Sequence, residues 1–325
     1  TWPQDKEENL HYLPALKQAG VEVNFLGDES IDFPVQSFLQ GARYAEIQQL
    51  TDIPGYMRQD VWDIYVALMA FRPQVLHCWL DKPNLTGAVA GWLAGTPRIV
   101  LSTRNVNPSH FAYIHEDWYQ EWYSRMVKSP RVGIFGNSER GAKSYSEWLK
   151  LPLSSIPVIH NGIDFDVLGE PSVDEVIRFR EGLGLKPGDP LIAGVFRINY
   201  EKRPSLFLRV VGELYKTNPK LKAVIAGIGP LEEEVRDEIA NRKLEGVIHL
   251  LGRSKDIPVI FKAADVALLT SSEEGLPNVL MEAQWFETPV VCTDAGGSAE
   301  VVSDGYSGYV CQVGDARAIV QRISE

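Results

Sequence analysis

Short apolar runs alternate along the chain with longer segments of helical periodicity. We interpret the runs, which are rich in Val, Ile and Leu, as strands: Val21–Leu26, Val75–Cys78, Ile99–Ser102, Val132–Phe135, Ile156–Ile159, Leu191–Val195, Ala223–Ala226, Val247–Leu250, Val266–Thr270, Pro289–Cys292 and Gly308–Cys311. Most of them lack the alternation of polar and apolar residues that marks a strand with one face in water. Such runs indicate parallel strands covered on both faces.

The segments between these runs have helical spacing or composition. We predict helices at Glu7–Ala19, Asp60–Phe71, Asn84–Ala94, Tyr113–Val127, Ser138–Leu149, Val173–Glu181, Pro204–Tyr215, Leu231–Asn241, Pro258–Ala263, Asn278–Phe286 and Ala316–Ser324. The alternation predicts an α/β protein with two doubly wound, Rossmann-like domains whose parallel sheets face each other across a cleft.

A stretch rich in glycine and proline, residues 160–190, separates the two halves. We therefore expect an N-terminal domain of residues 1–166 and a C-terminal domain of residues 167–325. Two domains also suit a chain of 325 residues, which is about twice the common domain length. Because the sequence opens directly on a predicted helix, we expect the first strand and its following loop to be missing from the N-terminal domain.

Charge and composition exclude several classes of protein. The chain has 43 acidic and 32 basic residues and a net charge of −11, which argues against a non-specific nucleic-acid-binding protein. No apolar run approaches the roughly 18–20 residues that cross a bilayer. The three cysteines, Cys78, Cys292 and Cys311, suit neither a zinc site nor a disulfide framework. Reduced thiols and a cytoplasmic location are expected.

The most informative stretch follows the strand predicted at Val266–Thr270. It reads Ser-Ser-Glu-Glu-Gly-Leu-Pro-Asn and leads into a helix that we expect Asn278 to cap. The unpaired N–H groups of a first helical turn bind anions. Glu274 in the loop and Glu282 in the helix are placed to accept hydrogen bonds from the hydroxyls of one sugar-nucleotide-sized ligand. The alternative is an ordinary loop acid and an ordinary acid on a surface helix.

The arrangement Glu-Gly-Leu-Pro-Asn-x-x-x-Glu, with Glu274 and Glu282 separated by seven residues, resembles the signature of family-4 retaining glycosyltransferases of GT-B fold. Further elements occur in the order expected for that family: Asn161-Gly162-Ile163-Asp164, Val195-Phe196-Arg197 with Lys202, Gly227-Ile228-Gly229-Pro230, His249-Leu250-Leu251-Gly252 and Asp294-Ala295-Gly296-Gly297. The chain departs from the pattern at Phe196, where glycine is usual, and at Arg203, which precedes Pro204 and replaces a glycine.

The resemblance implies a binding site for a nucleotide diphosphate sugar, UDP- or GDP-linked. Arg197 and Lys202 would neutralise the donor diphosphate, and Glu274 would act at the donor sugar; we expect these three to be the catalytic residues. The remaining donor contacts would come from the ends of two strands and the start of one helix, at Gly252, Arg253, Ser254, Gly275, Leu276, Pro277, Asn278 and Glu282. The family needs no cofactor and no catalytic metal.

The acceptor side is less marked in the sequence. His77 and Arg104 follow or end predicted strands of the first half, and we name both as candidate acceptor-side residues. His77 has the alternative of being a core histidine, and Arg104 stands where many relatives carry a histidine. The expected acceptor is a glycan of polysaccharide biosynthesis, a lipid-linked saccharide or a small molecule, with peripheral contact at the inner face of the membrane.

The sequence is also compatible with other functions. The expected reaction is hexosyl transfer with retention, and the alternatives are a non-catalytic sugar-nucleotide-binding subunit, a GT-B nucleotide-sugar epimerase or a phosphorylase. His110 and His115 lie near acidic residues, but their spacing fits no standard metal site. Gly227-x-Gly229 lacks the third glycine of a dinucleotide-binding motif, because Glu232 stands at that position. An NAD-dependent enzyme is not expected.

Overall fold

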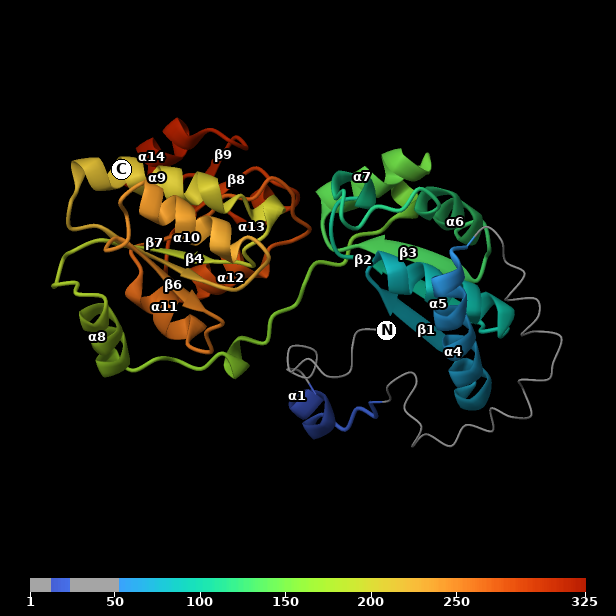
Figure 1. Cartoon of the computed structure of the whole chain (residues 1–325). Helices are drawn as coiled ribbons and strands as arrows, with labels where there is room; N and C mark the ends of the chain where they lie inside the picture. The colour runs from blue at the N-terminus through green and yellow to red at the C-terminus, as the bar shows by residue number, and fades with distance from the viewer. Residues whose placement is uncertain (1–12, 24–52) are drawn as a thin grey trace. The chain divides into compact units, whose positions relative to one another are not determined.

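The computed structural model describes residues 13–23 and 53–325 of the chain (Figure 1). Both sheets are parallel and carry helices, which confirms the predicted α/β class. No helix in these residues is long and apolar enough to span a bilayer.

The chain divides into two compact units. Unit 1 contains the described residues up to Thr103 together with His115–Phe135, and unit 2 contains Arg104–Ile114 and Gly136–Glu325. The domain boundary that we place at residue 166 stays a prediction.

Unit 1 is built on parallel strands in the described order β1-β2-β3. Its strands and helices are β1 (Val75–Trp79), β2 (Arg98–Thr103), β3 (Val132–Gly136), α1 (Leu13–Gln18), α4 (Gly55–Phe71), α5 (Asp81–Leu93) and α6 (Tyr119–Met126). Helix α5 packs on β1 and β2, and α4 packs on α5 (Figure 1). A Cβ atom on Gly87 of α5 would lie 2.4 Å from the Cys78 sulfur, so this glycine allows the helix to approach the sheet closely.

Unit 2 holds a six-stranded parallel sheet in the order β6-β5-β4-β7-β8-β9. Its strands are β4 (Leu191–Val195), β5 (Lys222–Ala226), β6 (Ile248–Gly252), β7 (Val266–Leu269), β8 (Val290–Thr293) and β9 (Gly308–Cys311). This is the doubly wound order in which the chain first proceeds outward from β4 to β6 and then returns to continue from β7 on the other side. The direction of winding reverses between β4 and β7.

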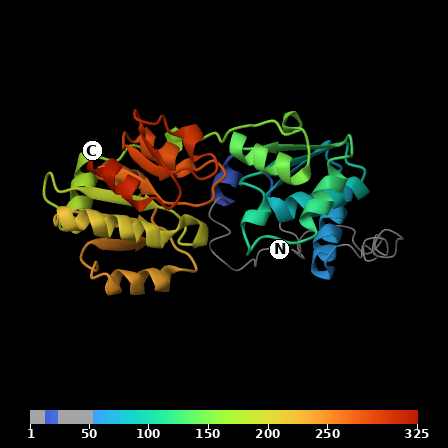
Figure 2. The ribbon, with the colours of Figure 1, turned by 90° about the horizontal axis from the view of Figure 1, so that it is seen from above.

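Helices cover both faces of this sheet. They are α8 (Val173–Gly182), α9 (Pro204–Thr217), α10 (Glu232–Asn241), α11 (Ile257–Ala263), α12 (Asn278–Trp285), α13 (Ser298–Val301) and α14 (Ala316–Ser324). Unit 2 also contains α7 (Glu139–Leu149), which does not pack on this sheet. Apolar residues of α9 and α10 enter one core cluster, and those of α8 and α11 enter another. Figure 2 shows α9, in yellow, alongside the sheet. Burial on both faces explains why the strands read as uninterrupted apolar runs.

Local chemistry fixes several helix ends. The Ser138 hydroxyl accepts a hydrogen bond from the Gly141 N–H and caps α7. Ser172 and Glu175 form a reciprocal capping box at the start of α8. The four N-terminal N–H groups of a helix lack partners within it, so such caps explain why these helices begin where they do.

Four predicted elements differ from the structure. Ile156–Ile159 is not a strand: it makes one isolated bridge, Gly136 to Val158, because Pro157 has no N–H to extend the ladder. The helix predicted from Tyr113 begins only at Tyr119, after a series of turns. Two predicted elements fall partly outside the described residues: the helix Glu7–Ala19, of which Leu13–Gln18 is observed, and the strand Val21–Leu26, whose residues 21–23 are not in a strand.

Candidate functional site

The two loops that follow β4 and β7 lie at the point where the winding of the sheet reverses. Ligands of doubly wound sheets bind outside the carboxyl ends of the strands at this switch point. Residues 196–203 follow β4 and contain Arg197 and Lys202, and residues 270–277 follow β7 and contain Glu274. The three predicted catalytic residues are therefore all on the loops that the topology marks as the site.

Lys202 and Glu274 form an ion pair across these loops. The Lys202 Nζ lies 2.5 Å from the Glu274 Oε1, and the Ser271 hydroxyl donates to the same oxygen at 2.7 Å. The side chains are 19% and 8% exposed, so the pair is largely removed from water. A carboxylate buried to this degree needs compensating donors, and Lys202 and Ser271 supply them.

Hydrogen bonds join the backbones of the two loops. The Thr270 hydroxyl lies 3.0 Å from the Lys202 carbonyl oxygen and 3.2 Å from that of Arg203. The Ser272 N–H donates to the Glu201 carbonyl at 2.7 Å. The positions of Lys202 and Glu274 are thus fixed by main-chain contacts in addition to their own ion pair.

Polar residues surround Lys202 on the β4 side. The Glu201 carboxylate accepts hydrogen bonds from the Asn199 amide at 2.5 Å and the Tyr113 hydroxyl at 2.6 Å. Burial raises the pKa of the Tyr113 phenol, and its hydrogen bond to Glu201 raises it further. Arg197 is exposed and forms no salt bridge among the described residues. Arg197 therefore places an exposed positive charge near the start of the loop that follows β4.

The glycines after β5 allow the backbone to pass close to the β4 loop. A Cβ atom on Gly227, whose φ is +152°, would lie 1.9 Å from the Phe196 carbonyl oxygen, and one on Gly229 would lie 2.1 Å from that of Ile198. Only glycine fits at such distances. These residues therefore shape the loop that carries Arg197 and Lys202.

Phe196, which departs from the family pattern, is buried in this structure. It is 6% exposed, and its ring lies 5.7 Å from that of Phe207 in α9. A Cβ atom on Gly194 would lie 2.6 Å from the Phe196 ring. The larger side chain at position 196 is therefore accommodated by a glycine two residues earlier in β4.

Helix α12 begins next to the ion pair and has no side-chain cap. Asn278 is its first residue and Pro277 its N-cap, so the prediction that Asn278 caps the helix was wrong by one position. Pro277 has no side-chain acceptor, and the N–H groups of Gly275 and Leu276 make no hydrogen bond within the described residues. The positive end of the helix dipole and these N–H groups suit an anion.

Glu282 lies one turn into α12 and is partly buried. Burial raises the pKa of its carboxyl above the ordinary 4.5. Its carboxylate makes no hydrogen bond or salt bridge within the described part of the chain. A partly desolvated acceptor without a partner is suited to hydroxyl donors of a ligand.

Asn161 of the Asn-Gly-Ile-Asp element supports the loop before α12. Its side-chain amide donates to the Leu276 carbonyl at 3.1 Å and to the Asn278 side chain at 2.6 Å, and its oxygen accepts from the Arg104 guanidinium at 2.6 Å. Burial lowers the pKa of Arg104. The structure thus brings Arg104, a predicted acceptor-side residue, to the residue that supports the loop before α12.

The residues predicted to read the nucleotide base follow β6. Gly252 has a left-handed backbone, with φ +63°, and its carbonyl accepts from the Gly227 N–H at 2.8 Å. The Ser254 hydroxyl accepts from the Asp256 N–H at 3.0 Å, and Arg253 is exposed. Their assignment to the base stays a prediction.

The histidines do not form a metal site in the described residues. His77 on β1 is exposed and lies 4.9 Å from the Trp79 ring, so it is not a core histidine. His110 pairs with Glu273 and His115 with Asp117, at 3.3 and 3.5 Å. No group of three or more metal-binding side chains occurs in residues 13–23 and 53–325.

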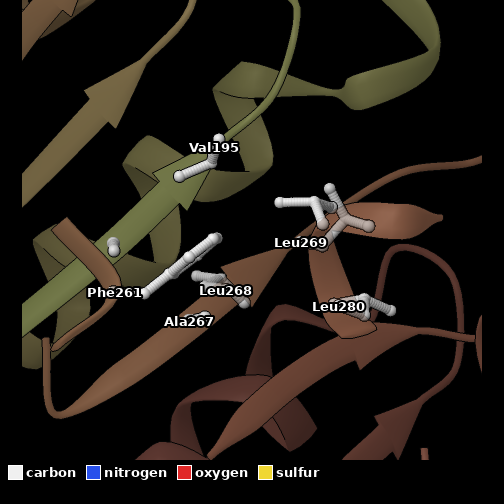
Figure 3. Close-up of a pocket in the computed structure, with 8 residues that line it drawn as sticks. Val195, Phe261, Ala267, Leu268, Leu269 and Leu280 are labelled. Carbon is white, nitrogen blue, oxygen red and sulfur yellow. The ribbon is translucent and has the colours of Figure 1, made fainter. Parts of the chain in front are cut away.

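An apolar pocket lies at the carboxyl ends of β4 and β7 (Figure 3). Its lining comes from β4, β7, α11 and α12 and consists of Ala193, Val195, Phe261, Ala267, Leu268, Leu269, Val279 and Leu280. None of these side chains is titratable. We interpret the pocket as part of the packing that supports the two loops rather than as the site of chemistry.

Comparison with known proteins identifies the family. Residues 10–167 match the model described as glycosyltransferase family 4, and residues 175–325 match the model described as glycosyl transferases group 1. The chain belongs to the family-4 glycosyltransferases of GT-B fold. The two matches together account for nearly all of the sequence.

Two curated relatives align over most of this chain. The Vi polysaccharide biosynthesis protein VipC/TviE of Salmonella typhi is 28% identical over 94% of this chain, which spans 50% of that protein. The UDP-Gal:alpha-D-GlcNAc-diphosphoundecaprenol alpha-1,3-galactosyltransferase of Escherichia coli is 22% identical over 97% of this chain and 82% of its own length. This chain therefore spans about half of the first relative and most of the second.

Solved structures share the fold. Anabaena HepE in complex with UDP and glucose has a TM-score of 0.74 at 21% identity, over 96% of this chain and 78% of that one. A glycosyltransferase from Rickettsia africae has a TM-score of 0.71 at 17% identity, over 97% of this chain and 76% of that one. The GT-B fold expected from the sequence is confirmed.

Proposed function

We propose that this protein is a retaining glycosyltransferase that moves a hexosyl group from a nucleotide diphosphate sugar to a glycan or lipid-linked acceptor. The observation that carries the proposal is the Lys202–Glu274 ion pair at the switch point of the sheet, beside the uncapped start of α12. Two cations, Lys202 and Arg197, unpaired N–H groups and two carboxylates, Glu274 and Glu282, are groups suited to binding a nucleotide diphosphate sugar.

Each group has a role in this proposal. Lys202 and the exposed Arg197 stabilise the negative charge that grows on the diphosphate as the bond to the sugar breaks. The N–H groups of Gly275 and Leu276 contact the phosphate and sugar, and Glu282 accepts hydrogen bonds from the ribose hydroxyls. Glu274 orients both Lys202 and the donor sugar.

The reaction proceeds without a protein nucleophile. The acceptor hydroxyl attacks the anomeric carbon on the face from which the diphosphate leaves, and its proton passes to the departing phosphate oxygen. The carbon–oxygen bond to the phosphate breaks as the new glycosidic bond forms, so configuration is retained. Catalysis then depends on positioning and on electrostatic stabilisation of the leaving group.

We assign UDP-hexose as the first donor to test and a polyprenyl-linked saccharide as the first acceptor. Solved relatives hold UDP or UDP-glucose, and a curated relative is named for UDP-Gal and a diphosphoundecaprenol acceptor. Such an acceptor would bring the protein to the inner face of the membrane. A cytoplasmic location follows from this proposal, because nucleotide sugars are made there.

The test begins with ligand-induced thermal shifts for UDP, GDP, ADP and their sugar conjugates, on the wild type and on Glu282→Ala. A ligand that binds only the folded state raises its stability by mass action. We expect a shift with one nucleotide family that is lost in the variant. Transfer to an acceptor, with the anomeric configuration of the product read by NMR, then tests retention. Donor binding without transfer would support a binding subunit, and free nucleotide without acceptor would support an epimerase.

A further inference from the structure

The turn that carries Lys202 has a strained backbone. Arg203, the next residue, has φ +48° and ψ +57°, a left-handed conformation in a residue that is not glycine. This is the position at which the family pattern has glycine. A non-glycine residue keeps such a conformation only where its surroundings hold it in place.

Pro204 holds one side of this turn. It occupies the first position of α9, where its ring restricts the chain and its missing N–H is not needed. The Arg203 carbonyl accepts from the Leu206 N–H at 2.9 Å. These contacts explain how the helix starts, but they do not fix the direction of the Lys202 side chain toward Glu274.

Thr270 contacts this turn from the loop that follows β7. It follows β7, is 0% exposed, and its hydroxyl lies within hydrogen-bond distance of the carbonyl oxygens of both Lys202 and Arg203. Glu274, the ionic partner of Lys202, lies four residues further along the same loop. One hydroxyl therefore connects the strained turn to the loop that carries the partner of its lysine.

We propose that Thr270 is a positioning residue whose hydroxyl holds the Lys202–Arg203 turn, so that the ammonium group of Lys202 is already in place beside Glu274 when the donor binds. This inference rests on the proposed function, because Lys202 is the residue assigned to the leaving diphosphate. Preorganised charge is effective in catalysis because no reorganisation is needed as the reaction proceeds.

Three variants separate positioning from folding. Thr270→Val removes the hydroxyl at nearly constant shape, and Thr270→Ser keeps it. Thr288→Val is the matched control: Thr288 is 3% exposed and its hydroxyl donates to the Phe261 carbonyl at 2.7 Å. It precedes β8 and so lies at the amino edge of the same parallel sheet, opposite the site.

The first readout is sugar-transfer kinetics, measured together with the thermal unfolding of each variant. We expect Thr270→Val to lower kcat about 10- to 100-fold, the range that a small misplacement of a catalytic group produces, with little change in the donor KM. Thr270→Ser should restore turnover. We expect Thr288→Val to lose about as much thermal stability as Thr270→Val and to keep the kcat of the wild type. Equal kcat in Thr270→Val and Thr288→Val, or failure of serine to restore turnover, would overturn the inference.

The second readout does not depend on activity. Acylation of Lys202 by an amine-reactive ester, followed by peptide mass spectrometry, is compared with that of Lys216, which is exposed. We expect Lys202 to react several-fold faster in Thr270→Val than in the wild type or in Thr270→Ser. If the wild type transfers no sugar but this pattern holds, the proposed function fails and the positioning role stands. Unchanged labelling in Thr270→Val would overturn the positioning role.

Discussion

The Glu274 carboxylate accepts hydrogen bonds from Lys202 and Ser271 on a single oxygen, Oε1, and leaves its second oxygen without a bond to either residue. The two donors lie in the segments that follow the neighbouring strands β4 and β7. The other oxygen of Glu274 is then oriented by a fixed ion pair. A carboxylate held in this way can receive a sugar hydroxyl without first changing its rotamer.

Loss of Lys202 should affect turnover far more than folding. In Lys202→Ala we expect kcat to fall about 10²- to 10³-fold, as when one group that stabilises a leaving charge is removed. The free energy of unfolding should fall by about 1–3 kcal/mol, because Glu274 loses one of two donors in a buried setting. Lys216→Ala, which breaks an exposed pair with Glu213, is the control. Turnover like that of the wild type in Lys202→Ala would contradict the assignment.

Replacement of Glu282 should raise the stability of the fold at pH 7 and weaken nucleotide binding. Burial raises the pKa of this carboxyl above 4.5 in the folded state. Ionisation of Glu282 is therefore less favourable in the folded protein than in the unfolded chain. The free energy of unfolding is highest at low pH, where the carboxyl is neutral in both states, and it falls as pH rises through the raised pKa. Glu282→Gln should therefore unfold at higher denaturant than the wild type at pH 7, and the difference should disappear below pH about 4.5. The same variant should bind the nucleotide diphosphate more weakly.

Glu233→Gln, an exposed acid on α10, serves as the control for that pH series. We expect the denaturant midpoint of Glu233→Gln to equal that of the wild type at every pH. A Glu282→Gln variant that is less stable than the wild type at pH 7 would mean that the carboxylate is stabilised in the folded state by contacts that outweigh its burial.

Two glycine substitutions should have opposite effects. Gly227→Ala places a methyl group 1.9 Å from the Phe196 carbonyl oxygen at a φ of +152°, and we expect it to lower the free energy of unfolding by more than about 2 kcal/mol. Gly212→Ala lies within α9, where a Cβ atom would meet Leu244 at an ordinary 3.5 Å. It should raise stability by about 0.5–1 kcal/mol. Denaturant unfolding of both variants tests the pair.

Asn161 should be needed for donor binding although it lies more than 100 residues from Leu276 in the sequence. Asn161→Ala removes its hydrogen bonds to Leu276 and Asn278, and we expect a loss of about 1–2 kcal/mol in stability together with a higher donor KM. Asn161→Asp keeps the acceptor for Arg104 but not the donor for the loop. It should therefore raise the donor KM as Asn161→Ala does, and a KM near the wild-type value in Asn161→Asp would show that the donated bonds are dispensable.

The strands of unit 2 could be predicted because their sequences reflect burial on both faces. The predictions for β4 and β9 match the structure at both ends, and those for the other four strands lie within a residue or two. Where prediction failed, proline was the reason in two places. Pro157 ends pairing in a run that is otherwise apolar, and Pro277 takes the cap position that Asn278 was expected to hold.

The sequence could single out the candidate site residues, but it could not predict their contacts. Lys202 and Glu274 are 72 residues apart, and only the strand order that makes β4 and β7 neighbours brings them together. Tyr113 and Glu201 are 88 residues apart and belong to no motif. Ser271 and Thr270 are common residue types at a strand end, so nothing in the sequence distinguishes them from other loop hydroxyls.

The order of the strands in the sheet of unit 2 differs from their order along the chain. Ile192 in β4 pairs with Val266 in β7, and the segment between them contains β5, β6 and helices α9, α10 and α11. On the ribosome, the half-sheet β4-β5-β6 is complete while one side of β4 still has no neighbour. Emergence of β7 covers that edge, and Glu274 follows β7 within a few residues, so we expect the Lys202–Glu274 ion pair to form together with the pairing of β4 and β7, before β8 and β9 are added.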